Sequence, residues 1–160
     1  MVDCCSAPGL IPFEQALENM LAAIKPITDV ENITLTQALG RVLSNDITSP
    51  INVPGHNNSA MDGYAFAHES LQNQQSLTLV GRSMAGQPFE GECKKGQCIR
   101  IMTGAKIPAD CDTVEMQENC QVDGENIHFL APRHRGDNVR LAGEDISRDQ
   151  VVFKTGRRLS

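Results

Sequence analysis

The clearest periodic pattern in the chain lies near its beginning. Between Pro12 and Lys25, apolar residues recur at helical spacing opposite a polar face that carries Glu14 and Glu18. Pro12 suits the first position of a helix, and Pro26 stops one. The pattern predicts an amphipathic helix whose apolar stripe packs in a core or an interface; the stripe consists of Phe13, Ala16, Leu17, Met20, Leu21 and Ile24.

Two shorter elements are predicted after this helix. Residues 31–35 have the composition of a short strand, and Thr36 is placed to cap a brief helix over residues 37–43. From Ser49 the character changes, because Pro50, Pro54 and Gly55 punctuate a polar run. We interpret this run as a loop and a domain boundary.

The middle of the chain alternates short β-like segments with turns. Asp123-Gly124 is a hairpin signal, and one helical turn is expected near residues 67–71. These features predict a compact β-rich domain over about residues 53–139. Its predicted strands are residues 63–66, 77–81, 97–102, 113–117 and 127–131.

The tail returns to a helix-or-turn pattern at residues 144–146 and a strand at residues 151–154. If the tail packs back on the first 48 residues, the β-rich domain is an insertion within a discontinuous outer domain. The predicted fold class is α+β. A discontinuous first domain comprises residues 1–48 and 143–160 and carries the amphipathic helix, and the inserted second domain comprises residues 49–142.

Composition narrows the function classes. The net charge of −6 argues against a nucleic-acid surface, because neutralising phosphates requires clustered Lys and Arg. No stretch approaches the roughly 18 apolar residues of a membrane-spanning helix, and the signature of a signal peptide is missing, so we expect a cytoplasmic protein. The six cysteines lack CxxC pairs and zinc spacing, which favours reduced thiols. The four histidines are scattered in polar contexts that are typical of surface residues rather than metal ligands.

The first candidate for chemistry is Asp62. It precedes Gly63 at the end of a polar loop and immediately before a predicted strand. Asp62-Gly63 is compatible with an ordinary tight turn, in which Gly63 adopts a backbone conformation that is unfavourable for other residues. It is also compatible with a carboxylate on a rigid corner that holds Mg²⁺ through water or orients a nucleophile beside a phosphate.

The second candidate is Thr103, which a predicted strand delivers to a glycine turn. Its hydroxyl, followed by the amides of Gly104 and Ala105, has the pattern of a small anion-binding nest. An ordinary strand end gives the same sequence. The third candidate run joins Arg140 with Glu144 and Asp145. Acidic residues there suit a helix start, and they would also suit a ligand-facing cluster.

In order and spacing, these runs resemble the molybdenum insertion enzymes, the molybdopterin molybdenumtransferase family of bacterial MoeA and the gephyrin E domain. The resemblance extends from about Pro12 to the end of the chain. Its matching pieces are NSAMDGYA at residues 58–65, Gly86-Gln87-Pro88, IRIMTGA at residues 99–105, Pro108, Val114, Met116-Gln117-Glu118, and GEDI at residues 143–146.

The resemblance implies both a fold and a reaction. Members have an elongated, discontinuous first domain with an inserted β-rich second domain, followed by an adenylyltransferase-like domain and a small β-barrel. Their first domain contributes to the subunit contact, so the helix predicted over residues 12–25 is expected to be dimer-forming. With Mg²⁺ assistance they insert molybdate into adenylylated molybdopterin and release AMP. Their active site is a cleft within a homodimer, so this chain is expected to supply one wall. The alternative is a folded dimerisation or scaffold module without activity of its own.

The resemblance also implies roles for individual residues. Asp62 would place Mg²⁺ or the pyrophosphate, and Thr103 would donate a hydrogen bond to a phosphate or molybdate oxygen. The expected upstream partner is molybdopterin adenylyltransferase. Glu115 departs from the family pattern, which usually has an apolar residue there. Further substrate-binding candidates are Ser59, Glu118, Arg140 and Glu144.

Overall fold

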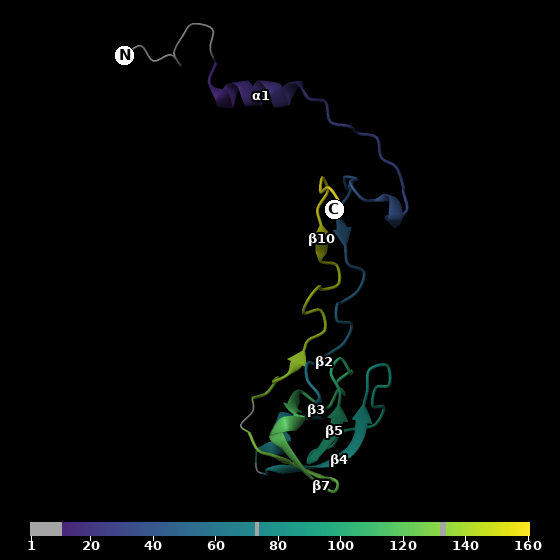
Figure 1. Ribbon diagram of the computed structural model, residues 1–160, viewed down its shortest axis with the longest axis vertical. Coiled ribbons are helices and arrows are strands. Elements are labelled where there is room, and N and C mark those ends of the chain that lie inside the picture. Colours follow the sequence, from purple (N-terminus) through teal and green to yellow (C-terminus); the bar gives the residue numbers. More distant parts are fainter. Residues whose placement is uncertain (1–10, 73, 132–133) are drawn as a thin grey trace, which may run out of the picture.

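The computed structural model describes residues 11–72, 74–131 and 134–160, and it is elongated (Figure 1). A six-stranded sheet lies at one end, a narrow stem of paired segments leads away from it, and helix α1 (Phe13–Ala23) stands apart beyond the stem. The mixture of one helix with a dominant sheet confirms the predicted α+β class.

The sheet has the strand order β6-β3-β5-β4-β8-β7. Only β4 and β5 run parallel, with a bulge between Leu79 and Gly81, and the other neighbours are antiparallel. Its strands are β3 (Gly63–Phe66), β4 (Ser76–Ser83), β5 (Gln97–Ile101), β6 (Thr113–Met116), β7 (Cys120–Asp123) and β8 (Asn126–Phe129).

Side-chain alternation along β3 gives the sheet two buried faces. Ala65 belongs to one hydrophobic cluster with Ile99, Ile101 and Val114. The β3 residues on either side of it, Tyr64 and Phe66, belong to the other cluster. The first cluster consists of Ala65, Cys93, Ile99, Ile101, Ala105, Ile107, Cys111 and Val114, and the second of Tyr64, Phe66, Leu77, Cys98, Ile127 and Phe129. Both faces of β3 and β5 are therefore covered, and these two strands form the centre of the domain.

The stem is made of two segments that are far apart in sequence. Strand β1 (Ile47–Thr48) pairs with β10 (Val151–Phe153), and β2 (Asn58–Ser59) pairs with β9 (Val139–Arg140). Val53 bridges Ile146 between these two pairs. The two segments thus lie side by side (Figure 1), as a discontinuous first domain requires, while its boundaries at residues 48 and 143 stay predictions.

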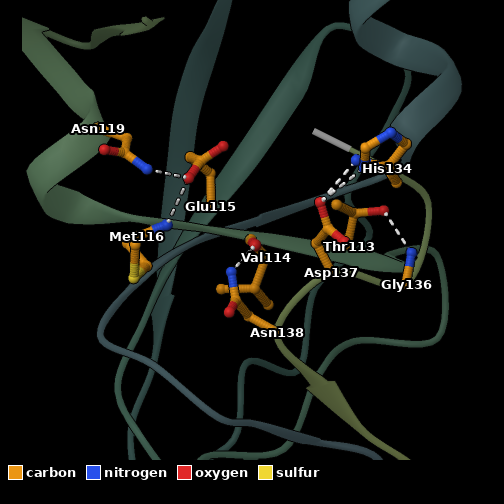
Figure 2. Close-up of polar contacts among 9 residues, drawn as sticks. All are labelled: Thr113, Val114, Glu115, Met116, Asn119, His134, Gly136, Asp137 and Asn138. Atoms are coloured by element: carbon orange, nitrogen blue, oxygen red, sulfur yellow. Dashed lines mark hydrogen bonds and ion pairs between the residues drawn. The ribbon is translucent and has the colours of Figure 1, made fainter. Parts of the chain in front are cut away.

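The outer edge of β6 is covered by residues 134–138 (Figure 2). The Val114 amide donates to the Asp137 carbonyl oxygen (3.0 Å), and the Asn138 side-chain amide donates to the Val114 carbonyl oxygen (2.9 Å). Gly136 N–H donates to Thr113 Oγ1 (3.3 Å). An unpaired strand edge is a template for aggregation, so this cover protects β6.

Glu115 lies on β6 and is 4% exposed. Its Oε1 accepts hydrogen bonds from the Met116 amide (3.1 Å) and from the Asn119 side chain (2.8 Å), as Figure 2 shows. Buried polar groups need such partners. The departure from an apolar residue is therefore accommodated by local donors.

Helix α1 is confirmed close to its predicted bounds, but its apolar stripe has no cover within the described chain. The strand predicted at residues 31–35 and the helix at 37–43 are wrong: a 3-10 turn, η2 (Leu35–Gln37), forms instead. These residues are almost all exposed, so packing supports neither element.

No helix among residues 11–72, 74–131 and 134–160 is long and apolar enough to cross a membrane.

The remaining predictions for the β-rich domain are mostly confirmed. The five expected strands form with shifts of a residue or two, and η3 (His68–Leu71) is the expected helical turn. Residues 123–126 form the β7–β8 hairpin, but β7 itself was not predicted. A further 3-10 turn, η4 (Gln117–Asn119), follows β6.

Gly63 is required for close approach, which corrects the prediction that it serves an unusual dihedral. It lies within β3, and a Cβ built there would sit 1.9 Å from the Glu115 carbonyl oxygen of the neighbouring strand. Gly63 is also not among the glycines with positive φ. The backbone of β6 therefore occupies the space in which a side chain would lie.

We expect Gly63→Ala to lower the free energy of unfolding by about 3 kcal/mol, because backbone rather than a movable side chain blocks the added methyl. Urea unfolding monitored by circular dichroism measures the change. The matched control is Gly55→Ala, whose Cβ would meet nothing closer than Asn52 O at 4.0 Å. Equal midpoints for Gly63→Ala and the parent chain would contradict this account.

Candidate functional site

The site is built on the bend between β2 and β3. Ser59, which is 1% exposed, shapes this bend: its hydroxyl donates to the Met61 carbonyl oxygen (2.5 Å) and accepts from the Met61 amide (3.3 Å). Its backbone is also bracketed, because Ser59 N–H donates to Ala105 O (3.0 Å) and Gly104 N–H donates to Ser59 O (2.8 Å). Ser59 therefore positions the bend through its side chain and its backbone, and its role in substrate binding stays a prediction.

Asp62 and Thr103 meet across this bend, although 41 positions separate them. Asp62 Oδ1 accepts from both the amide and the hydroxyl of Thr103, each at 2.7 Å. The backbone hydrogen bond and then the hydroxyl bond from Thr103 lower the pKa of Asp62, and the charge of Arg100 adds to that effect. The carboxylate is consequently ionised and fixed in direction.

The expected anion nest at residues 103–105 does not form. The Thr103 amide donates to Asp62, the Gly104 amide to Ser59 and the Ala105 amide to the Met102 carbonyl oxygen (2.9 Å). Gly104 adopts a positive φ of 79°, which suits glycine at this turn. The turn therefore holds a protein carboxylate in the position expected for a ligand anion.

Two neighbours of Asp62 were not singled out from the sequence. Arg100 lies opposite Tyr64 in the sheet, with its guanidinium 5.1 Å from the Tyr64 ring centre, and donates to Gly63 O (3.1 Å) and to Gln117 Oε1. The Gln117 amide donates to Asp62 O (3.0 Å). The alternation along residues 97–101 could have indicated Arg100, because it is the one cation in that strand.

The predicted residue Glu118 is exposed on η4 and accepts from the Gln117 side chain (3.1 Å). It is thus joined to Asp62 through its neighbour. The Asn58 side-chain oxygen, Oδ1, is buried on β2 and accepts no hydrogen bond from the described residues.

Arg140 and Glu144 form a local ion-pair cluster. The Arg140 guanidinium contacts Glu144 Oε1 (3.4 Å) and Asp145 Oδ1 (2.6 Å), and Glu144 Oε2 accepts from the Leu141 amide (2.8 Å). The hydrogen bond and charge of Asp145, followed by those of Glu144, raise the pKa of Arg140. The capping interpretation is wrong, because residues 141–146 form a turn and start no helix. The two carboxylates instead neutralise the cation within this turn.

Among residues 11–72, 74–131 and 134–160, no three His, Cys, Asp or Glu side chains gather to hold a metal ion. Asp62 nevertheless has a second oxygen, Oδ2, to which no described residue donates. Mg²⁺ is commonly bound by one or two carboxylates together with waters and substrate phosphates. A single fixed carboxylate therefore fits Mg²⁺ and does not fit a metal that needs an all-protein cage.

Comparisons with known proteins point in one direction. The family described as "MoeA N-terminal region (domain I and II)" matches residues 11–160. The molybdopterin molybdenumtransferase of Haemophilus influenzae is 39% identical over 152 residues, which cover 94% of this chain and 38% of that protein. Gephyrin of Dictyostelium discoideum is 29% identical over 171 residues, covering 96% of this chain and 24% of gephyrin.

A solved structure agrees with these matches. The molybdopterin biosynthesis MoeA protein of Pyrococcus horikoshii superposes with a TM-score of 0.80 at 34% identity. The match covers 91% of this chain and 39% of that protein. The chain accordingly spans less than two fifths of the length of these relatives.

We expect Thr103→Val to raise the pKa of Asp62 part of the way toward its ordinary value, because the hydroxyl bond is lost and the amide bond remains. Because the pKa of Asp62 is lower in the folded chain, the interaction stabilises the fold above the ordinary carboxyl pKa. This contribution is lost as the pH falls through the lowered value. An NMR titration of the Asp62 carboxyl carbon measures the shift.

Thr78→Val on β4 is the matched control, because Thr78 is exposed and lies outside the site. It should leave the Asp62 titration unchanged. The same Asp62 pKa in Thr103→Val and the parent chain would show that the hydroxyl bond does not hold the carboxylate.

Proposed function

This chain belongs to the family of MoeA N-terminal regions, and on that basis we propose that it acts in molybdenum cofactor biosynthesis by supplying one wall of a molybdate-insertion site. The substrates are adenylylated molybdopterin and molybdate, and AMP is released. The observation that carries this proposal is the ionised Asp62 carboxylate, fixed by both donors of Thr103.

Asp62 is the residue of this chain that would hold Mg²⁺. One carboxylate oxygen is engaged by Thr103, which leaves Oδ2 to bind the ion or one of its waters. When bound, Mg²⁺ supplies positive charge beside phosphate oxygens. Asp62 thereby orients the pyrophosphate of the adenylylated substrate.

Thr103 acts first as a positioning residue. Its hydroxyl proton is donated to Asp62, so donation to a phosphate or molybdate oxygen requires the hydroxyl to rotate away. Arg100 and Gln117 support the same corner by their contacts with Gly63 and Asp62. Glu118, Arg140 and Glu144 stay predicted substrate contacts of lower rank than Asp62.

In the proposed scheme a homodimer completes the cleft, and molybdopterin adenylyltransferase delivers the substrate in the cytoplasm. Exposed apolar residues support the dimer: Phe13 is 74% exposed and Met20 68%. A hollow of about 740 Å³ lies on the segment that follows α1 and is lined by Ile27, Leu35 and Val42, among others. Apolar surface of this extent is typical of interaction sites.

The test of activity joins this chain to the remaining part of the Haemophilus influenzae relative. We expect this chimera to insert molybdate, and Asp62→Asn or Thr103→Ala to lower turnover by roughly a hundredfold or more, because a preorganised charge next to the reacting phosphate is lost or displaced. Molybdate uptake and AMP release are measured in parallel.

The control variants are Asp123→Asn in the β7–β8 hairpin and Thr78→Ala on β4, both exposed, and they should keep parental turnover. Unchanged turnover in Asp62→Asn and Thr103→Ala would remove these residues from the site. A folded, dimeric but inactive chimera would favour the scaffold module instead.

The dimer has a separate test. We expect Met20→Glu to weaken self-association by roughly tenfold or more, because a charge replaces an apolar side chain that is buried only in the dimer. Gln15→Glu adds the same charge on the polar face of α1 and should have little effect. Sedimentation equilibrium measures both variants, and a parent chain that stays monomeric at its highest soluble concentration would contradict the proposal.

A further inference from the structure

Two cysteines in the first hydrophobic cluster have contacting thiols. Cys93 precedes β5 and Cys111 precedes β6; they are 5% and 7% exposed. Their side chains share a hydrogen bond, and the Cys93 thiol also donates to the Gln97 carbonyl oxygen (3.5 Å). Cys98 belongs to the second cluster instead, so it is separated from this pair by the sheet.

Each thiol borders its own hollow at the surface. Cys93 lines a hollow of about 340 Å³ together with Lys94 and Lys95, and Cys111 lines another of about 360 Å³. Asp110 lies on both. A small solute can therefore approach the pair from two sides, although the sulfur atoms themselves are largely buried.

The hydrogen bond between the two thiols makes their environments unequal. The hydrogen bond from Cys111 lowers the pKa of Cys93, against the opposing effects of burial and of Asp110. The same hydrogen bond and then burial raise the pKa of Cys111. Cys93, the acceptor of the hydrogen bond between the two thiols, is assigned as the attacking sulfur, and Cys111 lies in contact with it to resolve what forms on it.

We propose that Cys93 and Cys111 form a reversible oxidation site that a peroxide converts to a disulfide. The Cys93 thiolate attacks a peroxide oxygen, the O–O bond breaks, and the leaving hydroxide takes up the thiol proton as water. Cys111 sulfur then attacks the sulfenic acid. An S–S bond forms, the S–O bond breaks, and a second water leaves with the Cys111 proton. Two electrons pass from the sulfurs to the peroxide.

The bridge would tie the loop before β5 to the loop before β6. These strands flank β3 on either side, so the cross-link restrains the centre of the sheet. Restricting the unfolded chain stabilises the fold. We expect the melting temperature to rise by roughly 5 °C on oxidation and to return on treatment with dithiothreitol. This site is independent of the proposed function.

The experiment treats the chain with hydrogen peroxide, blocks free thiols with iodoacetamide and maps tryptic peptides by mass spectrometry. Cys93 lies in the peptide of residues 83–94, and Cys111 in that of residues 107–133. The second peptide also holds Cys120, so the experiment uses a Cys120→Ser background. Cys4 and Cys5 are replaced by Ser as well, which removes disulfides outside the pair.

The expected product is a cross-link between these two peptides that dithiothreitol removes. Cys93→Ser should abolish both the cross-link and the thermal shift, and Cys111→Ser should trap sulfenic acid on Cys93, detectable with dimedone. Cys98 is the internal control, because burial raises its pKa to about 12. The peroxide should leave its thiol unoxidised. Over-oxidation of Cys93 without the cross-link, or recovery of both peptides fully alkylated, would overturn the proposal.

Discussion

The backbone pairing of residues 57–63 with residues 101–107 is the constraint on which the site depends. Ile107 N–H donates to Asn57 O (2.9 Å), Gly104 and Ala105 bracket Ser59, and Gly63 pairs with Ile101. These bonds hold two turns against each other, so that the Thr103 amide points at Asp62. The absence of a side chain at Gly63 lets β6 close in from the other side. Fixed backbone, rather than a side-chain cluster, gives the carboxylate its direction.

The features that could be predicted from the sequence are those that depend on the spacing of nearby residues. Helical spacing located α1, alternation located the long strands, and the runs around Asp62 and Thr103 led to the pair that the fold brings together. The stem strands β1, β2 and β9 were missed because two-residue strands have no period and their pairing partners lie far along the chain. Strand β10 was predicted, at residues 151–154. Arg100 was missed as a neighbour of Asp62 for a related reason. Its position follows from strand register, which a single strand does not specify.

The need for a packing partner also explains the wrong predictions at residues 31–43, before the stem. Residues 31–35 have strand-like composition, but strand propensity reflects packing on a sheet, and the described chain offers them none. Gly63 was assigned the right importance for the wrong reason, since the clash that selects glycine comes from Glu115 O on another strand. The residue type shows that a position such as Gly63 is structurally restricted. The physical reason for the restriction comes from the strand that packs next to it.

The charges around Asp62 bear on how the anionic substrate of the proposed reaction would be held. Asp62 is ionised, and the amides of residues 103–105 already donate within the chain. Arg140 is neutralised by Glu144 and Asp145. A phosphate brought directly against Asp62 Oδ2 would meet like charge, which is costly wherever water is excluded. A divalent cation between the two anions reverses that interaction and makes the carboxylate attractive. Under the proposed function, the corner is therefore suited to a metal-bridged phosphate.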